Sequence, residues 1–128
     1  MNIYYEPVNL NQWHMFEKVS GVGHVETFLA TKTMSMGDII LLHVGRQNKN
    51  YDSGIYAIGC VIKEPHIYKA SQEDYCFNKL SVEVEIVKIN YSVPYITHEE
   101  CKDFIKQFRT VHKINEEHYS YIKKLLNV

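Results

Sequence analysis

The chain has 128 residues, enough for one domain with one hydrophobic core and too few for a second core of any size. Hydrophobic residues make up 45% and charged residues 23%, the balance of an ordinary globular protein. The formal net charge of −1 argues against a protein that coats nucleic acid by charge alone, because such binding needs clustered lysines and arginines. A pocket that holds one nucleotide is compatible with this charge.

No apolar run approaches the roughly 18 residues of a membrane helix. The N-terminus lacks the basic start and apolar stretch of a signal peptide. We therefore expect a cytoplasmic protein with no membrane partner, in which residues 1–128 form a single domain.

The potential metal ligands are scattered. Cys60, Cys76 and Cys101 include no Cys-x-x-Cys pair, and we expect them to be free, structural thiols. His14 and His24 lie ten residues apart, and none of the seven histidines completes a compact zinc pattern. The sequence therefore predicts neither a metal nor a cofactor.

The N-terminal third begins with a short expected strand, Ile3–Tyr5, that ends at Pro7. Asn9 is placed to cap a helix over Leu10–Val19, which has apolar residues at helical spacing. Two glycines in the following loop suggest a close approach of the backbone to another group. Residues Glu26–Met36 fit a strand and a helical turn equally well.

Two apolar runs, Gly37–Gly45 and Gly54–Lys63, predict a strand pair joined by a polar loop. Alternation places Ile39, Leu41 and His43 on one face of the first strand. Gly59, in the middle of the second strand, indicates a bulge or bend.

The C-terminal half starts with an alternating strand over Lys79–Tyr91. Thr97–Glu100 is a capping box, which predicts a helix that runs to about Phe108. A last helix is expected from Asn115, and one side of it is lined by Ile114, His118, Tyr121, Ile122 and Leu125. This order indicates an α+β fold around a small curved sheet or barrel, with two C-terminal helices.

Catalytic motifs are weak. Glu83 and Glu85 share a strand face, but paired acids on a solvated face are usually only surface charges. Gly21 and Gly23 lack the third glycine of a dinucleotide fingerprint, and no nucleophile elbow occurs. What remains is a set of aromatic, imidazole and cationic groups that suits the stacking of a planar base. Its members are Trp13, His43 and Arg46.

The order of motifs as a whole resembles EVE domains, which belong to the PUA-like superfamily with YTH and ASCH domains. The most specific part is Gly37–Asp38 leading into an apolar strand, followed by Gly54–Val61. The other matching segments are Ile3–Tyr5, Pro7–Asn9 with Trp13, Gly21–His24 and Met34–Met36. The resemblance covers about residues 3–65 by motif and the rest by element order.

This resemblance implies a PUA-like curved β-barrel flanked by helices, with a pocket for a flipped, often modified base. Carried over to this sequence, the base-binding residues are Trp13, Val22, Gly23, His24, Thr33, His43 and Gly45. The backbone of the glycine loop would bind the base edge, while Trp13 and His43 would stack on or bond to the base. Arg46 and Lys49 would touch phosphate.

The expected function is therefore a nucleic-acid-binding module for a modified base in DNA, without a catalytic site. It would serve as the specificity domain of a modification-dependent restriction system, with a nuclease or NTPase partner or a missing C-terminal domain. Two alternatives stay open. One is RNA binding, and the other is an ASCH-like amidohydrolase on modified nucleosides, which needs Lys32, Thr33 and Glu26 to converge.

Overall fold

The computed structural model describes all 128 residues. The elements in chain order are β1 (Ile3–Val8), α1 (Met15–Lys18), β2 (Val25–Leu29), β3 (Ile39–Val44), β4 (Gly54–Val61), β5 (His66–Ile67), β6 (Leu80–Ile89), β7 (Ile96–Thr97), α2 (His98–Cys101), β8 (His112–Lys113), the 3-10 turn η1 (Glu116–His118) and α3 (Tyr119–Leu126).

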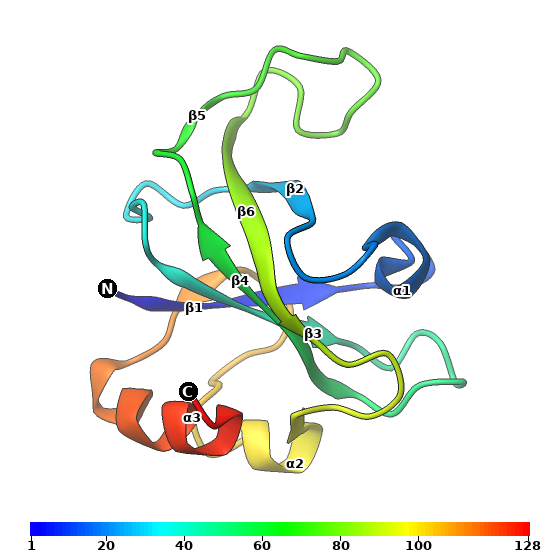
Figure 1. The fold of residues 1–128 in the computed structure, drawn as a ribbon, viewed down its shortest axis with the longest axis vertical. Helices are drawn as coiled ribbons and strands as arrows, with labels where there is room; N and C mark the ends of the chain where they lie inside the picture. The colour runs from blue at the N-terminus through cyan, green and yellow to red at the C-terminus, as the bar shows by residue number, and fades with distance from the viewer.

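The strands form one mixed sheet in the order β2-β6-β4-β3-β1-β8, with β5 paired to β6 and β7 to β4. Only β1 and β3 pair in parallel. The sheet curls into a half-barrel, with α2 and α3 below it and α1 beyond the end of β1 in the view of Figure 1. The predicted α+β class, a PUA-like curved barrel with helices including two near the C-terminus, is confirmed.

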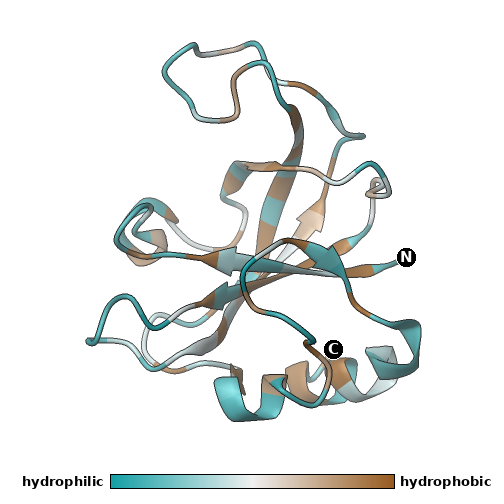
Figure 2. Ribbon diagram, turned by 180° about the vertical axis from the view of Figure 1, so that it is seen from behind, coloured by the Kyte–Doolittle hydropathy of each residue, from teal (hydrophilic) through white to brown (hydrophobic).

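The strand pair β3–β4 separates two hydrophobic cores. Ile40, Leu42 and Val44 enter the core that contains Trp13 and Phe28 at its border. Leu41 enters the second core, under the C-terminal helices. The predicted alternation along this strand is therefore confirmed. Figure 2 shows the same pattern as hydrophobic positions along the strands and hydrophilic residues in the outer loops.

Gly59 marks a bulge, as predicted. The pairing of β4 with β6 shifts register between Ile58 and Gly59, and a second shift occurs between Leu42 and His43 in β3–β4. A Cβ atom at position 59 would clash with the side chain of Val84. Glycine is therefore required where the sheet bends and the two strands approach each other.

The helix predicted for Leu10–Val19 is reduced to α1. The carbonyl of Asn9 accepts hydrogen bonds from the N–H groups of Gln12 and Trp13, at 3.0 and 2.9 Å. His14 then has φ −80° and ψ 88°, which interrupts any helix that starts at residue 10. The result is a tight turn that positions Trp13, followed by a single helical turn.

The ambiguous segment Glu26–Met36 is a strand at its start, because β2 pairs with β6 over Val25–Leu29. The predicted capping box is present at Thr97 and Glu100, but α2 ends at Cys101 instead of Phe108. The Cys101 carbonyl accepts from two following N–H groups, and this turn directs Phe104 and Ile105 into the core.

The last helix follows Asn115, which caps η1 through its side chain. Ile122 and Leu126 form its buried side, whereas Tyr121 is 41% exposed. The prediction for Tyr121 was wrong, because the four-residue spacing of the two aliphatic residues turns it outward. None of these helices has both the length and the apolar character needed to cross a membrane.

Two adjacent cavities beside the first strand

A cavity of about 510 Å³ lies between the end of β1, the turn after it and β2. Its volume falls in the usual range for small-ligand sites. We call it the Trp13 cavity. The residues that line it are Glu6, Pro7, Val8, Asn9, Gln12, Trp13, Glu26, Thr27, Phe28, Asp74 and Tyr75.

Two aromatic residues line this cavity, and because their rings are nearly perpendicular, a planar ligand can stack on only one of them. Trp13 is half-buried, and its ring meets that of Phe28 edge to face, with centroids 5.7 Å apart and planes at 85°. Phe28 is held by β2, where it pairs with Val82 of β6. The turn at Asn9 fixes Trp13 from the other side. Both rings are thus positioned before any ligand binds.

Glu6 is a carboxyl group on the core face of a strand. It alternates with Tyr4 and Val8, which both enter the hydrophobic core, and it is only 8% exposed. Its carboxyl group makes no hydrogen bond or ion pair and lines the Trp13 cavity. Burial raises the pKa of Glu6 from 4.5 to about 8. At neutral pH the group is therefore mostly a neutral acid, with one O–H donor and one carbonyl acceptor.

Glu26 brings a second carboxyl group to the same cavity. Its Oε1 accepts a hydrogen bond from Nε2 of His24 at 2.9 Å. His24 Nδ1 in turn lies 3.4 Å from the backbone nitrogen of Ser20, which donates to it. These two bonds assign the Nε2–H tautomer to His24 and fix the orientation of Glu26.

The loop between β5 and β6 adds a third acid, Asp74, and a tyrosine, Tyr75. Tyr75 is 63% exposed, so its ring keeps contact with solvent beside the cavity. No lysine, arginine or histidine lines the cavity. It is therefore both aromatic and acidic, a combination that suits a planar ligand carrying hydrogen-bond donors.

A second cavity, of about 660 Å³, lies on the other side of the end of β1. We call it the arginine cavity because Arg46 and Arg109, both exposed, lie at its rim. The residues that line it are Pro7, Val8, Asn9, Gln12, His43, Gly45, Arg46, Gln47, Ser53, His98, Phe108 and Arg109.

His43 forms the floor of the arginine cavity. It is 2% exposed, and its ring nitrogens contact the Tyr5 hydroxyl at 3.2 Å and Nδ1 of His98 at 3.3 Å. Its ring packs against Tyr5 and Phe108, with centroids 5.3 and 5.1 Å away. The predicted stacking of a base on His43 is not supported, because neighbouring side chains already cover the ring.

Burial and the neighbouring charges of His98 and Arg46 lower the pKa of His43 to about 4. Burial and the charges of Arg46 and Lys102 also lower the pKa of His98. Both imidazoles are therefore mostly neutral at pH 7. The positive charge of the cavity comes from its two arginines, which suit a phosphate group.

The two cavities share one wall. Four residues line both, and they are Pro7, Val8, Asn9 and Gln12. An acidic, aromatic cavity and a cationic cavity thus lie next to each other, separated by the end of β1 and the turn that follows it. This division of charge matches the two ends of a nucleotide.

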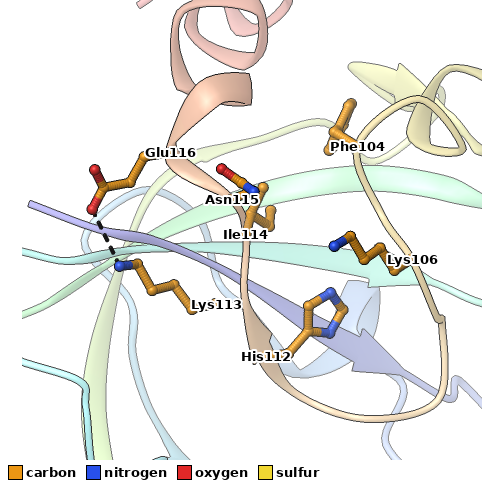
Figure 3. Close-up of a pocket in the computed structure, with 7 residues that line it drawn as sticks. All are labelled: Phe104, Lys106, His112, Lys113, Ile114, Asn115 and Glu116. Carbon is orange, nitrogen blue, oxygen red and sulfur yellow. Dashed lines mark hydrogen bonds and ion pairs between the residues drawn. The ribbon is translucent and has the colours of Figure 1, made fainter.

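Figure 3 shows a third, smaller hollow of about 410 Å³, near the C-terminal strand and turn. Lys113 there is paired with Glu116 at 3.2 Å, and the His112 ring packs on Tyr5, with centroids 5.2 Å apart. Lys106 is the remaining cation, and Phe104 is buried in the core beneath. This hollow has neither a free aromatic face nor a cluster of unpaired charges.

Only some of the residues predicted to bind the base line these cavities. Trp13 lines the Trp13 cavity, and His24 contacts it through Glu26. His43, Gly45 and the predicted phosphate ligand Arg46 line the arginine cavity.

The glycine loop lines neither cavity. The N–H of Gly23 donates to Ile86 at 2.8 Å, that of His24 donates to Gly21, and Val22 is 72% exposed. The backbone donors of Gly23 and His24 are thus occupied, which corrects the prediction that they bind a base edge. Gly23 has a φ of +94°, which residues with a Cβ rarely adopt, so the backbone conformation and not a lack of space favours glycine there.

Thr33 and Lys49 also lie outside both cavities. The Thr33 hydroxyl is hydrogen-bonded to that of Tyr4 at 2.7 Å. Of Lys32, Thr33 and Glu26, only Glu26 lines either cavity. The structure also brings no three histidine, cysteine or acidic side chains together in a group that could hold a metal ion.

Three lining residues were not singled out from the sequence. Glu6 could have been identified from the sequence, because it is a charged residue at a core-facing position of an otherwise apolar strand. Phe28 lay in the ambiguous segment. Arg109 follows a stretch predicted as helix, and nothing in the sequence placed it beside Arg46, 63 residues earlier.

Neither family models nor curated proteins match this sequence. Solved structures do. A Pseudomonas syringae protein has a TM-score of 0.67 at 13% identity, covering 97% of this chain and 99% of its own. A hypothetical protein from Leishmania major has a TM-score of 0.66 at 12% identity, covering 99% of this chain and 95% of its own.

A variant of the ASCH protein ZmASCH from Zymomonas mobilis has a TM-score of 0.58 at 14% identity, covering 98% of this chain and 99% of its own. At these identities the likeness shows the fold alone. It places the chain among small curled barrels that include an ASCH domain, in agreement with the PUA-like architecture.

Proposed function

We propose that this protein binds nucleic acid by taking one flipped base into the Trp13 cavity and the adjoining phosphate into the arginine cavity. The observation that carries this proposal is the shared wall between the two cavities. One cavity has aromatic walls and acidic edges, and the other has two arginines. A nucleotide offers a flat base and an anionic phosphate in the same relation.

The fold adds to this argument. PUA-like and ASCH domains bind nucleic acids or act on modified nucleosides, and the sequence resemblance to EVE domains implies a pocket for a flipped base. Extrusion of a base from a duplex costs a few kcal/mol, which stacking in the cavity must offset. Stacking on aromatic side chains contributes about 1–3 kcal/mol per base, so one base stacked on Trp13 offsets much of this cost.

The finer proposal is a reader of a modified base in DNA, as in modification-dependent restriction systems, where a partner nuclease or NTPase would act on the bound site. RNA binding is the first alternative. Competition of one labelled ligand against methylated duplex DNA, plain duplex DNA, single-stranded DNA and RNA separates these. A preference for the methylated duplex supports the reader, and a preference for RNA supports the alternative.

An ASCH-like amidohydrolase is the second alternative, with less support. Of its three candidate residues only Glu26 lines the Trp13 cavity, and no lysine lines that cavity. Incubation with an acylated cytidine tests it directly. Release of cytidine that is lost in Glu26→Gln but kept in Glu83→Gln would favour the enzyme over the binding module.

The proposed function itself is tested by binding of a short single-stranded oligonucleotide, measured by fluorescence polarisation. Trp13→Ala and Arg46→Ala should each weaken binding, because they remove a stacking wall and a phosphate ligand. Lys49→Ala and Val22→Ala change exposed residues outside both cavities and should leave binding intact. Equal binding by all four variants would contradict the proposal.

A further inference from the structure

We propose that the Trp13 cavity selects a base that carries an exocyclic amino group, as cytosine and adenine do, and that Glu6 and Glu26 determine this specificity. This inference rests on the proposed function and adds the class of base to it. It starts from the placement of Glu6, a carboxyl group that is more than nine-tenths buried, has no partner and lines the cavity.

Nδ1 of His14 is the only fully buried side-chain polar atom without a hydrogen-bond partner, so the unpartnered carboxyl oxygens of Glu6 remain accessible from the cavity. Tyr4 and Val8, which precede and follow Glu6 on the same face of β1, are both buried in the hydrophobic core. A ligand in the cavity can therefore reach this carboxyl group and form hydrogen bonds with it. Glu6 is therefore best explained as a group that contacts the ligand and not as part of the scaffold.

The protonation state of Glu6 defines what it can bind. Burial raises the pKa of Glu6 to about 8, so below that pH the group offers an O–H donor beside a carbonyl acceptor. The pairing edges of cytosine and adenine offer the matching set, a ring nitrogen that accepts and an amino group that donates. Two parallel hydrogen bonds then hold the base edge.

Glu26 decides between amino and carbonyl edges. A neutral acid alone also pairs with uracil, whose ring N–H and carbonyl present the reverse order. Glu26 Oε1 accepts from His24, which leaves Oε2 without a hydrogen bond in a cavity that has no cationic lining residue. An amino group has a second hydrogen to donate to this carboxylate, whereas a carbonyl oxygen in the same place would face a negative charge.

The acidity of the cavity also explains the separation from phosphate. Glu6, Glu26 and Asp74 line the Trp13 cavity, and both arginines line its neighbour. A phosphate is repelled from the first and attracted to the second, so the nucleotide binds in one orientation. The base enters the acidic side.

The test uses single-stranded oligonucleotides in which one base stands among abasic sites. Cytosine is compared with uracil, and adenine with hypoxanthine, because each pair exchanges an amino group for a carbonyl. At pH 6.5 the amino-bearing base should bind about tenfold to a hundredfold more tightly, the range of one good bidentate contact. Polarisation reports binding, and quenching of Trp13, the single tryptophan, reports entry into the cavity.

Three variants assign the selectivity. Glu26→Gln should reduce the preference for cytosine over uracil to a few-fold. Glu6→Gln, which resembles the neutral acid, should keep cytosine binding at pH 6.5 and pH 9, whereas the affinity of the unmodified protein should fall about tenfold at pH 9. Glu83→Gln, on the neighbouring strand and outside both cavities, is the matched control and should change nothing.

The outcomes separate the two proposals. Equal affinity for cytosine and uracil, with Trp13 quenched by both, overturns the selectivity and leaves the base-binding function standing. No binding of any oligonucleotide overturns both. A tighter complex with uracil or hypoxanthine also overturns the selectivity, because it requires a cavity that favours carbonyl edges.

Discussion

The ring of Trp13 meets the ring of Phe28 edge to face, with centroids 5.7 Å apart and planes at 85°. One residue comes from the turn after β1 and the other from β2, two segments that meet only because β2 pairs with β6 across the sheet. Each ring limits the motion of the other. The cavity beside them is therefore largely preorganised, which lowers the entropy cost of binding a planar ligand.

Trp13→Ala should weaken the binding of a single-stranded oligonucleotide by about 1–3 kcal/mol, because base–aromatic stacking has this value by alanine substitution. Trp13→Phe, which keeps a flat ring, should lose less. Tyr121→Ala removes an exposed aromatic residue from α3 and is the control. Isothermal titration calorimetry measures the three affinities. An equal loss in the control variant would contradict a stacking role.

Arg46→Ala and Arg109→Ala should each weaken binding and reduce the slope of log K against log salt concentration by about 0.7–1, because each removes one phosphate contact. Lys49→Ala should leave the slope unchanged, since Lys49 is exposed and outside the arginine cavity. Titrations at several salt concentrations measure this. If all three variants keep the full slope, the arginines do not contact phosphate.

Glu6→Gln should stabilise the protein at neutral and alkaline pH. The pKa of Glu6 is raised from 4.5 to about 8 in the folded state, so between these values the folded state holds a proton that the unfolded state has lost. Stability then falls as pH rises, by up to about 1.4 kcal/mol per pH unit from this group. The gain of the variant should be near zero at pH 4.5 and grow toward pH 8. Urea unfolding across this range measures it, and a gain that does not change with pH would contradict the raised pKa.

His43→Asn should change how the free energy of unfolding depends on pH below pH 6.5. The pKa of His43 is lowered from 6.5 to about 4. Between these pH values His43 is mostly protonated in the unfolded state and mostly neutral in the folded state. Stability therefore falls as pH drops through this window. The variant should be less stable at pH 7, because it loses hydrogen bonds to Tyr5 and His98, but less sensitive to acid. An acid dependence as steep as before would show that other groups cause it.

These two groups act in opposite directions between pH 4.5 and 6.5. Over that range Glu6 lowers stability as pH rises and His43 increases it, so their contributions nearly cancel. Above pH 6.5 only the effect of Glu6 remains. The lowered pKa of His98 adds to the effect of His43. The unmodified protein should thus show no decline in stability from pH 4.5 to 6.5 and a decline from pH 6.5 to 8, which thermal unfolding followed by circular dichroism can record.

Much of the fold was predictable because its signals are local. Alternation identified β3 and β6, the glycine at position 59 identified the bulge, and Thr97 with Glu100 identified the start of α2. Helix lengths were not predictable in this way. They end where tertiary contacts require a turn, as after Cys101, where the chain bends to bury two more apolar residues.

The candidate site was only partly predictable, because it is assembled from distant segments. Trp13 and Arg46 were identified from residue type and from the resemblance. Arg109 joins Arg46 only through the tertiary fold. Glu6 could have been identified as a charged residue between apolar residues of the same strand face, but the cavity that it lines is completed by β2 and the loop before β6, which its sequence position does not reveal.

Quenching of Trp13 fluorescence by a nucleic acid tests the central claim most directly, because Trp13 is the single tryptophan and lines the proposed base cavity. An oligonucleotide with one cytosine among abasic sites should quench the emission saturably, at the same concentrations at which polarisation reports binding. The fully abasic strand should bind weakly and cause no quenching. Binding of the cytosine strand with unchanged Trp13 emission, or equal effects of both strands, would contradict the claim that a base enters this cavity.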